Sequence, residues 1–222
     1  MIVNLKKKHN FFRFTVLELR SSLWSNGYRM SLLIKNTEKT VTEIQKEILP
    51  NCEEFFVQVG YFWFSGFEEI YKSLKNKKIK IIIGINYDQK IYDLTQSSQS
   101  YLKQRYFNQL TDDINSTEIL DQNIQQDAQK LFVEKLKNGT LEIRLDPEKN
   151  DHSKFFIFKY SKKSIKDKLI PGTVLAGSSN FSRTGFLTNL QKNNNYMFYD
   201  KENFEAHSNR FNESWSKSIP IA

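Results

Sequence analysis

The fold is decided by residues 55–85, which read FFVQVGYFWFSGFEEIYKSLKNKKIKIIIGI. The runs Phe55–Tyr61 and Ile79–Ile85 are apolar and rich in aromatic and β-branched residues, which predicts two buried strands. Between them, Ser65 and Glu68 have the spacing of a capping box and predict the start of a helix. Strand, helix and strand with a short crossover form a βαβ unit, whose strands run parallel. We therefore expect an α/β fold with a mixed, largely parallel β-sheet flanked by helices.

Further elements are expected on both sides of this unit. Asn36 or Thr37 can cap a helix that Pro50 ends, and a second helix is expected before Gly139, which stops it. A C-terminal amphipathic helix closes the chain. The remaining short apolar runs predict four more strands: Leu141–Leu145, Phe155–Phe158, Thr173–Ala176 and Tyr196–Tyr199.

The chain divides into two parts in this interpretation. Residues 1–29 are basic and aromatic and end near the turn signal Asn26-Gly27, so they are expected to be an N-terminal extension. Residues 30–222 are expected to form one domain, and Met30 is a candidate internal start.

Composition limits the classes of function. The 222 residues carry a net charge of +8, which favours an anionic partner such as nucleic acid or an anionic membrane surface. One cysteine, Cys52, excludes an internal disulfide framework and a multi-cysteine zinc site, so we expect a reducing, cytoplasmic compartment and neither a cofactor nor a metal. No stretch approaches the roughly 18 apolar residues of a membrane-spanning helix.

Chemically reactive side chains are concentrated between residues 152 and 191. His152 and Lys154 are two apart at the head of an expected strand, so their side chains share one face and Ser153 points to the other. Ser178 and Asn180 follow the next strand after a glycine. An imidazole, an ammonium, an amide and a hydroxyl in one pocket suit a phosphodiester, with histidine as nucleophile or acid and the other groups holding phosphate oxygens.

The order of these residues resembles a known family signature. The segments 152-HSKFFIF-158 and 174-VLAGSSNFSRTGF-186 are similar to the His-x-Lys and Gly-Ser-x-Asn motifs of the phospholipase D-like superfamily. The closest likeness is to its nuclease domains in restriction-type and helicase-linked bacterial proteins, supported by residues 59–67, 138–144 and 204–215.

The resemblance implies a particular enzyme. It implies a phospholipase D-like fold and a metal-independent endonuclease whose catalytic residues are His152, Lys154 and Asn180, with Ser178 also binding the phosphate. Members with one motif look like homodimers, in which one histidine forms a phosphohistidine and the other protonates the leaving oxygen. The expected partners are DNA, a second copy and a helicase; no membrane partner is expected.

Two positions depart from the family pattern. Lys159 occupies the position of an aspartate that many nuclease members also lack. Gln191 replaces the glutamate that orients the histidine, so the alternative is a catalytically impaired module that binds DNA or a phosphodiester. Asp146 or Asp151 can substitute for that carboxylate, or both can be solvated loop residues.

Two further features remain open between a functional and a structural interpretation. The segment Lys159–Lys168 is rich in lysine and is either a surface for a nucleic-acid backbone or a solvated hairpin tip. Phe62, Trp63 and Phe64 can stack on a base, although an aromatic run after a buried strand more often belongs to the core or to a dimer interface.

Overall fold

The computed structural model describes residues 31–35, 40–99, 119–187 and 192–221, which all belong to the compact unit Ser31–Ala222. The expected N-terminal extension, the expected caps Asn36 and Thr37, and Gln191 lie outside the described residues.

One mixed sheet organises the described residues, and its strands lie in the order β1-β7-β6-β5-β2-β3-β4-β8. The strands are β1 (Ser31–Lys35), β2 (Cys52–Phe62), β3 (Lys78–Tyr87), β4 (Leu141–Leu145), β5 (Lys154–Tyr160), β6 (Gly172–Gly177), β7 (Asn194–Phe198) and β8 (Ile219–Pro220). Every strand predicted from the sequence is present, with β1 and β8 in addition.

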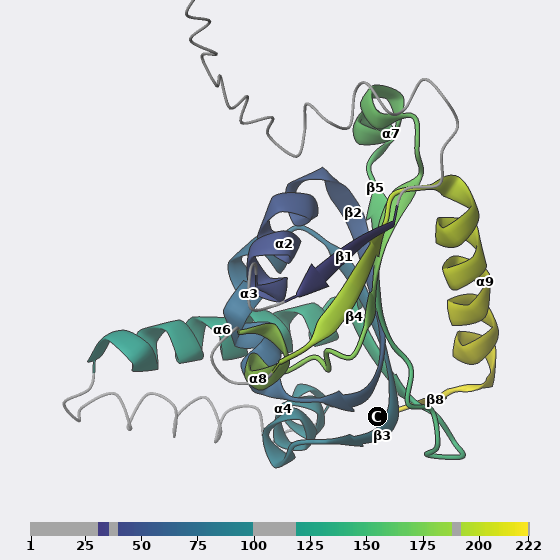
Figure 1. Cartoon of the computed structure of the whole chain (residues 1–222). Helices are drawn as coiled ribbons and strands as arrows, with labels where there is room; N and C mark the ends of the chain where they lie inside the picture. The colour runs from purple at the N-terminus through teal and green to yellow at the C-terminus, as the bar shows by residue number, and fades with distance from the viewer. Residues whose placement is uncertain (1–30, 36–39, 100–118, 188–191, 222) are drawn as a thin grey trace, which may run out of the picture. The chain divides into compact units, whose positions relative to one another are not determined.

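Helices cover both faces of this sheet (Figure 1). The helices of the described residues are α2 (Val41–Ile48), the short 3-10 turn η2 (Leu49–Asn51), α3 (Phe64–Leu74), α4 (Gln89–Gln99), α6 (Ile119–Lys137), α7 (Lys162–Lys168), α8 (Arg183–Phe186) and α9 (Lys201–Lys217). Helix α9 lies on one face, and α2, α3, α6 and α8 lie on the other. No helix in the described ranges combines the length and the hydropathy needed to cross a bilayer.

The expected α/β sheet flanked by helices is confirmed, but the expectation of a largely parallel sheet is wrong. Strand β2 pairs with β3 in parallel, and β3 with β4, as the βαβ pattern predicts. The other pairs, β1–β7, β7–β6, β6–β5, β5–β2 and β4–β8, are antiparallel. Strand β5 follows β4 after residues 146–153 and lies beside β2 in the opposite direction. It is joined to its antiparallel neighbour β6 by a connection that contains α7, and the Tyr160 N–H closes the base of this connection on the Pro171 carbonyl (2.9 Å).

The start of α3 also differs from the prediction. Trp63 is the N-cap and makes no side-chain capping bond, so Ser65 and Glu68 do not form a capping box. Instead, the Phe64 N–H donates to the Asp88 carboxylate (3.0 Å), and the Ser65 hydroxyl accepts from the backbone of Arg183 (3.3 Å). Long-range partners therefore replace the expected local cap.

Strand β2 contributes to two apolar layers because its side chains alternate between the faces of the sheet. Phe55 stacks on Phe158 on the face covered by α3 and α8. Phe56 stacks on Phe211 of α9, with ring centroids 4.9 Å apart, on the other face. Gln58 belongs to the same face as Phe56 and is fully buried. A polar amide thus lies beneath α9, near the carboxyl end of β2.

Candidate active site

The three expected catalytic residues lie against consecutive residues of β2. Lys154 is the Cα partner of Val59 in the antiparallel ladder. Gly60 lies against His152, because a Cβ placed on this glycine would be 3.7 Å from the His152 Cα atom. The following residue, Tyr61, donates its backbone N–H to Asn180 Oδ1 (3.3 Å). The structure thus brings the ammonium, imidazole and amide residues to the carboxyl end of the central strand.

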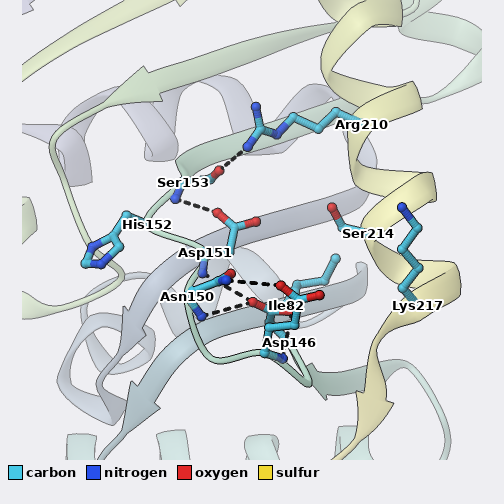
Figure 2. A pocket seen from close by; sticks show the side chains of 10 residues that line it. Ile82, Asp146, Asn150, Asp151, His152, Ser153, Arg210, Ser214 and Lys217 are labelled. Carbon is cyan, nitrogen blue, oxygen red and sulfur yellow. Dashed lines mark hydrogen bonds between the residues drawn. The ribbon is translucent and has the colours of Figure 1, made fainter.

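The Ser153 side chain points to the opposite face of the sheet from the Lys154 side chain, because side chains alternate along a strand. Lys154 begins β5 and has the same parity as Phe156, which packs toward Phe181 and Phe186. The Ser153 hydroxyl accepts a hydrogen bond from Arg210 of α9 (2.7 Å), on the opposite face. Figure 2 shows the His152 ring turned away from α9 and the Ser153 side chain turned toward it. Ser153 and Lys154 thus point to opposite faces of the sheet, as alternation along a strand requires.

Hydrogen bonds already orient two of these side chains. Lys154 Nζ donates to the His152 carbonyl (2.9 Å), which uses one of its three N–H groups. The amide of Asn180 accepts from Tyr61 through Oδ1, so its NH₂ group is left to donate. Lys154 and Asn180 therefore present donors, as a bound phosphate requires.

Ser178 has a different environment. Its Oγ donates to Asn193 Oδ1 (3.0 Å) and accepts from the Asn194 N–H (3.1 Å). The single hydroxyl proton is therefore engaged, and Ser178 would have to exchange this bond to donate to a phosphate. These contacts hold the turn after β6 against the start of β7. Gln191 is not among the described residues, so its expected contact with the histidine stays a prediction.

The loop that carries His152 is built on two carboxylates. Asp146 accepts backbone N–H groups from Asn150 and Asp151 through Oδ2 (3.2 Å each). Asp151 Oδ1 accepts a hydrogen bond from the backbone N–H of Ser153 (2.7 Å). His152 is the residue between them, so this bond fixes the backbone on both sides of the histidine. Neither carboxylate is hydrogen-bonded to the imidazole, so within the described structure they position the loop and do not orient the ring.

Asp151 is anchored in turn by a buried amide. Gln58 Nε2 donates to Asp151 Oδ2 (2.5 Å) and to the Ser214 hydroxyl of α9 (3.2 Å). Burial alone would raise the pKa of the Asp151 carboxyl. The hydrogen bonds from Ser153 and Gln58, with the positive charge of Arg210, outweigh burial and hold this pKa below its ordinary value. The carboxylate therefore stays ionised in its half-buried position.

Sequence reasoning missed this network. Asp151 was interpreted as a substitute for the orienting carboxylate or as a solvated residue, and Gln58, Arg210 and Ser214 were not singled out. One signal was present in the sequence, because Gln58 is the one amide within the apolar run Phe55–Tyr61. A polar side chain in a buried strand requires a partner, and such partners mark a functional or structural network.

A polar cavity of about 530 Å³ lies between this loop and α9 (Figure 2). Arg210, Ser214 and Lys217 line it from the helix, and His152 reaches its margin. Lys154 and Asn180 do not line it. Across residues 31–35, 40–99, 119–187 and 192–221, no three His, Cys, Asp or Glu side chains are grouped as ligands for a metal ion.

Comparison with protein families shows what class of protein carries this site. Residues 16–215 match the family model described as cardiolipin synthase, PLD-like domain. The chain therefore belongs to the family of phospholipase D-like (PLD-like) domains, as the two motifs indicated. The match begins within the segment expected to be an extension, so that boundary stays a prediction.

Solved structures with similar folds were also found. Nuc from Salmonella typhimurium, a phospholipase D family member, is 12% identical over 87% of this chain and 98% of its own, with a TM-score of 0.47. NucT from Helicobacter pylori is 13% identical over 87% and 99%, with a TM-score of 0.46. TrmBL2, an archaeal chromatin protein, is 16% identical over 91% and 58%, with a TM-score of 0.43. A comparison with curated proteins finds no match.

The contact of Gly84 with the His152 loop can be tested by adding one methyl group. A Cβ on Gly84 would lie 1.8 Å from the Asp151 carbonyl oxygen, which is backbone and cannot give way without moving the loop. We expect Gly84→Ala to lower the melting temperature by at least about 2 °C, the effect of an overpacking cost above ~1 kcal/mol in a chain of this size. Gly60→Ala is the matched control, because its nearest Asp151 atom would be 3.5 Å away. Equal melting temperatures for the two variants would contradict this contact.

The lowered pKa of Asp151 predicts a pH-dependent contribution to stability. Because the folded-state pKa is below the unfolded-state value, the contribution is fully present above about pH 4 and is lost as the pH falls through the folded-state pKa. Asp151→Asn should therefore melt below the wild type at neutral pH, and the gap should narrow in acid. Thermal unfolding of both proteins across this range measures it. Asp127→Asn, at an exposed position of α6, is the matched control for the loss of one carboxylate.

Proposed function

We propose that this chain is a metal-independent phosphodiesterase that cleaves DNA as an endonuclease. The observation that supports it most is the gathering of His152, Lys154 and Asn180 at the carboxyl end of β2, with the donors of Lys154 and Asn180 available. Loops at the carboxyl ends of the strands are where α/β sheets place their ligand sites. Membership in the PLD-like family, whose motifs these residues match, supports the same reaction class.

The proposed reaction has two steps. In the first, a His152 nitrogen attacks the phosphorus, the bond to the leaving oxygen breaks, and a second imidazole gives that oxygen a proton. In the second, water attacks the phosphorus of the phosphohistidine, the P–N bond breaks and releases the first imidazole, and the second imidazole takes the proton of the water. Lys154 and Asn180 stabilise the charge on the non-bridging oxygens in both steps. The second imidazole is His152 of the partner subunit, so the proposal includes a homodimer.

Two observations support DNA as the substrate. The net charge of +8 attracts a polyanion. Trp63 is 40% exposed just beyond the end of β2, whereas Phe62 and Phe64 beside it are buried. The backbone N–H of Trp63 donates to the Phe181 carbonyl (2.9 Å), next to Asn180 in the chain, so the exposed aromatic residue lies beside the site and can stack on a base. A role as the nuclease part of a helicase or restriction system is included in the proposal and is supported by the resemblance alone.

The central test is cleavage of plasmid DNA in the presence of EDTA. We expect the wild type to cleave, and His152→Ala to lose at least about 10³-fold in rate because the nucleophile is gone. His207→Gln is the matched control, since His207 lies on α9 and its Nδ1 hydrogen-bonds to the Asn203 carbonyl (2.8 Å). If His152→Ala cleaves as the wild type does, the histidine mechanism is excluded.

The same assay separates the enzyme from the binding module that Gln191 suggests. Replacing an orienting carboxylate by its amide costs about 10⁴ in the serine-protease triad. If Gln191 impairs this site, Gln191→Glu should raise EDTA-resistant cleavage by orders of magnitude, and Gln191→Glu combined with His152→Ala should return it to background. DNA binding by a wild type that does not cleave, together with such a gain, would favour the binding module.

A mixing experiment tests the shared site. Excess His152→Ala protein should suppress the activity of a fixed amount of wild type, because mixed dimers lack one of the two imidazoles. Excess His207→Gln protein should not. Light scattering should report twice the 26.3 kDa of one chain. A strict monomer whose activity is unaffected by mixing would exclude the dimeric mechanism.

A further inference from the structure

A second surface of the protein lies at the other end of β5. The segment between β5 and β6 was expected to be a lysine-rich loop, and it folds in part as α7. Two backbone hydrogen bonds fix its base: Tyr160 N–H to the Pro171 carbonyl (2.9 Å) and Ser161 N–H to the Asn51 carbonyl (3.0 Å). Figure 1 shows α7 beyond the sheet, at the opposite end of β5 from its start. We call residues 161–170 the α7 tip.

Two apolar side chains are displayed on this tip. Leu169 is 80% exposed, the highest value among the large apolar residues of the described structure, and Ile165 is 37% exposed. They are four residues apart and joined by the Leu169 N–H to Ile165 carbonyl bond (2.8 Å), so they lie on the same side of the helix. Together they present an apolar surface to solvent.

The backbone conformation of Leu169 is also unusual for a leucine. Leu169 is the C-cap of α7 with φ of 59°, in the left-handed region. Glycine or asparagine normally takes such a position, because a side chain with a Cβ is strained there. A leucine that is both strained and exposed breaks two local rules, and such positions concentrate at functional surfaces.

Lysines surround the apolar pair. Lys162, Lys163 and Lys166 are exposed and Lys168 is half-buried, against one acidic residue of the helix, Asp167. In the described part of the chain, none of these four lysines forms a salt bridge. Lys168 Nζ lies over the Tyr160 ring, 5.9 Å from its centroid. Within the described residues, no carboxylate therefore neutralises the charge of these lysines.

We propose that the α7 tip docks the protein onto an anionic lipid bilayer. The lysines would lie over acidic headgroups, and Leu169 and Ile165 would enter the boundary between headgroups and acyl chains. A nucleic-acid backbone would satisfy the lysines but would leave both apolar side chains in water, so a bilayer fits the whole surface better. This departs from the expectation of no membrane partner, which considered spanning or anchoring stretches and not a short folded tip.

The docked protein would keep its candidate active site open. Strand β5 has seven residues and spans roughly 20 Å, so Lys154 at its start is far from the tip at its end. Docking would therefore place the proposed nuclease at a membrane surface, and it does not depend on nuclease activity.

The experiment is sedimentation of the full chain with vesicles. We expect binding to vesicles of phosphatidylcholine mixed with phosphatidylglycerol, and none to phosphatidylcholine alone. Leu169→Asn should weaken binding at least about tenfold, because a leucine side chain no longer leaves water. The triple variant Lys162→Gln, Lys163→Gln and Lys166→Gln should weaken it by about 100-fold, at roughly fivefold for each lysine near an anionic surface.

Controls separate docking from folding and from total charge. Asparagine is favoured in the left-handed region, so Leu169→Asn should keep its melting temperature. A triple variant at other exposed lysines, Lys46→Gln, Lys75→Gln and Lys78→Gln, should retain most of the vesicle binding. DNA cleavage, if the wild type shows it, should be unchanged in Leu169→Asn.

Three results would overturn the proposal. They are a wild type that does not sediment with anionic vesicles, a Leu169→Asn variant that binds them equally well, and equal loss of binding in the two lysine variants. If the Lys162, Lys163 and Lys166 changes weaken DNA binding while the wild type ignores vesicles, the tip is a nucleic-acid surface instead. None of these results depends on whether His152 is catalytic, so the two proposals can fail separately.

Discussion

The arrangement of the candidate site depends on the hydrogen bond between Gln58 and Asp151. Gln58 is fully buried in the central strand, where an unpaired amide would cost several kcal/mol relative to water. Its Nε2 meets the Asp151 carboxylate, which in turn holds the backbone N–H of Ser153. The residue between Asp151 and Ser153 is His152. A requirement of the core, that a buried donor be paired, therefore fixes the loop from which the imidazole projects.

The glycines of the central strands make this contact possible. The Asp151 backbone passes so close to Gly84 that no side chain fits there, and it also lies over Gly60. Since Gly60 is flanked by Val59 and Tyr61, which contact Lys154 and Asn180, one short segment of β2 locates all three expected catalytic residues. The loop is thus seated on rigid strands, which suits a site whose groups must converge on one phosphate.

The sequence predicted the parts of the fold that depend on neighbouring residues. The βαβ unit and the strand after Lys154 follow from local apolar patterns, and the structure contains them. The antiparallel pairing of β5 with β2 joins Lys154 to Val59 across almost a hundred positions, and no local pattern encodes it. The capping box at Ser65 failed for the same reason, because its hydroxyl pairs with the distant Arg183. The candidate site shows a similar division. The motif residues His152, Lys154 and Asn180 can be recognised from short local patterns, whereas the contacts of Gln58 with Asp151 and with α9 join residues far apart in the chain.

Gln58 and Leu169 both depart from the local pattern of the sequence. They differ in whether the folded domain offsets the energetic cost of that departure. Gln58 places an amide in an apolar strand, and Asp151 and Ser214 within the same domain satisfy its donors. Leu169 places an apolar side chain in solvent and in a left-handed conformation, and it stays 80% exposed in the folded domain. The fold therefore offsets the cost of burying the Gln58 N–H groups, whereas Gln58 Oε1 has no hydrogen-bond partner among the described residues. The described fold does not offset the exposure and strain of Leu169, and the lysines beside it form no salt bridge with the described residues. A surface outside the chain that takes up both the apolar side chains and the positive charge explains these features better.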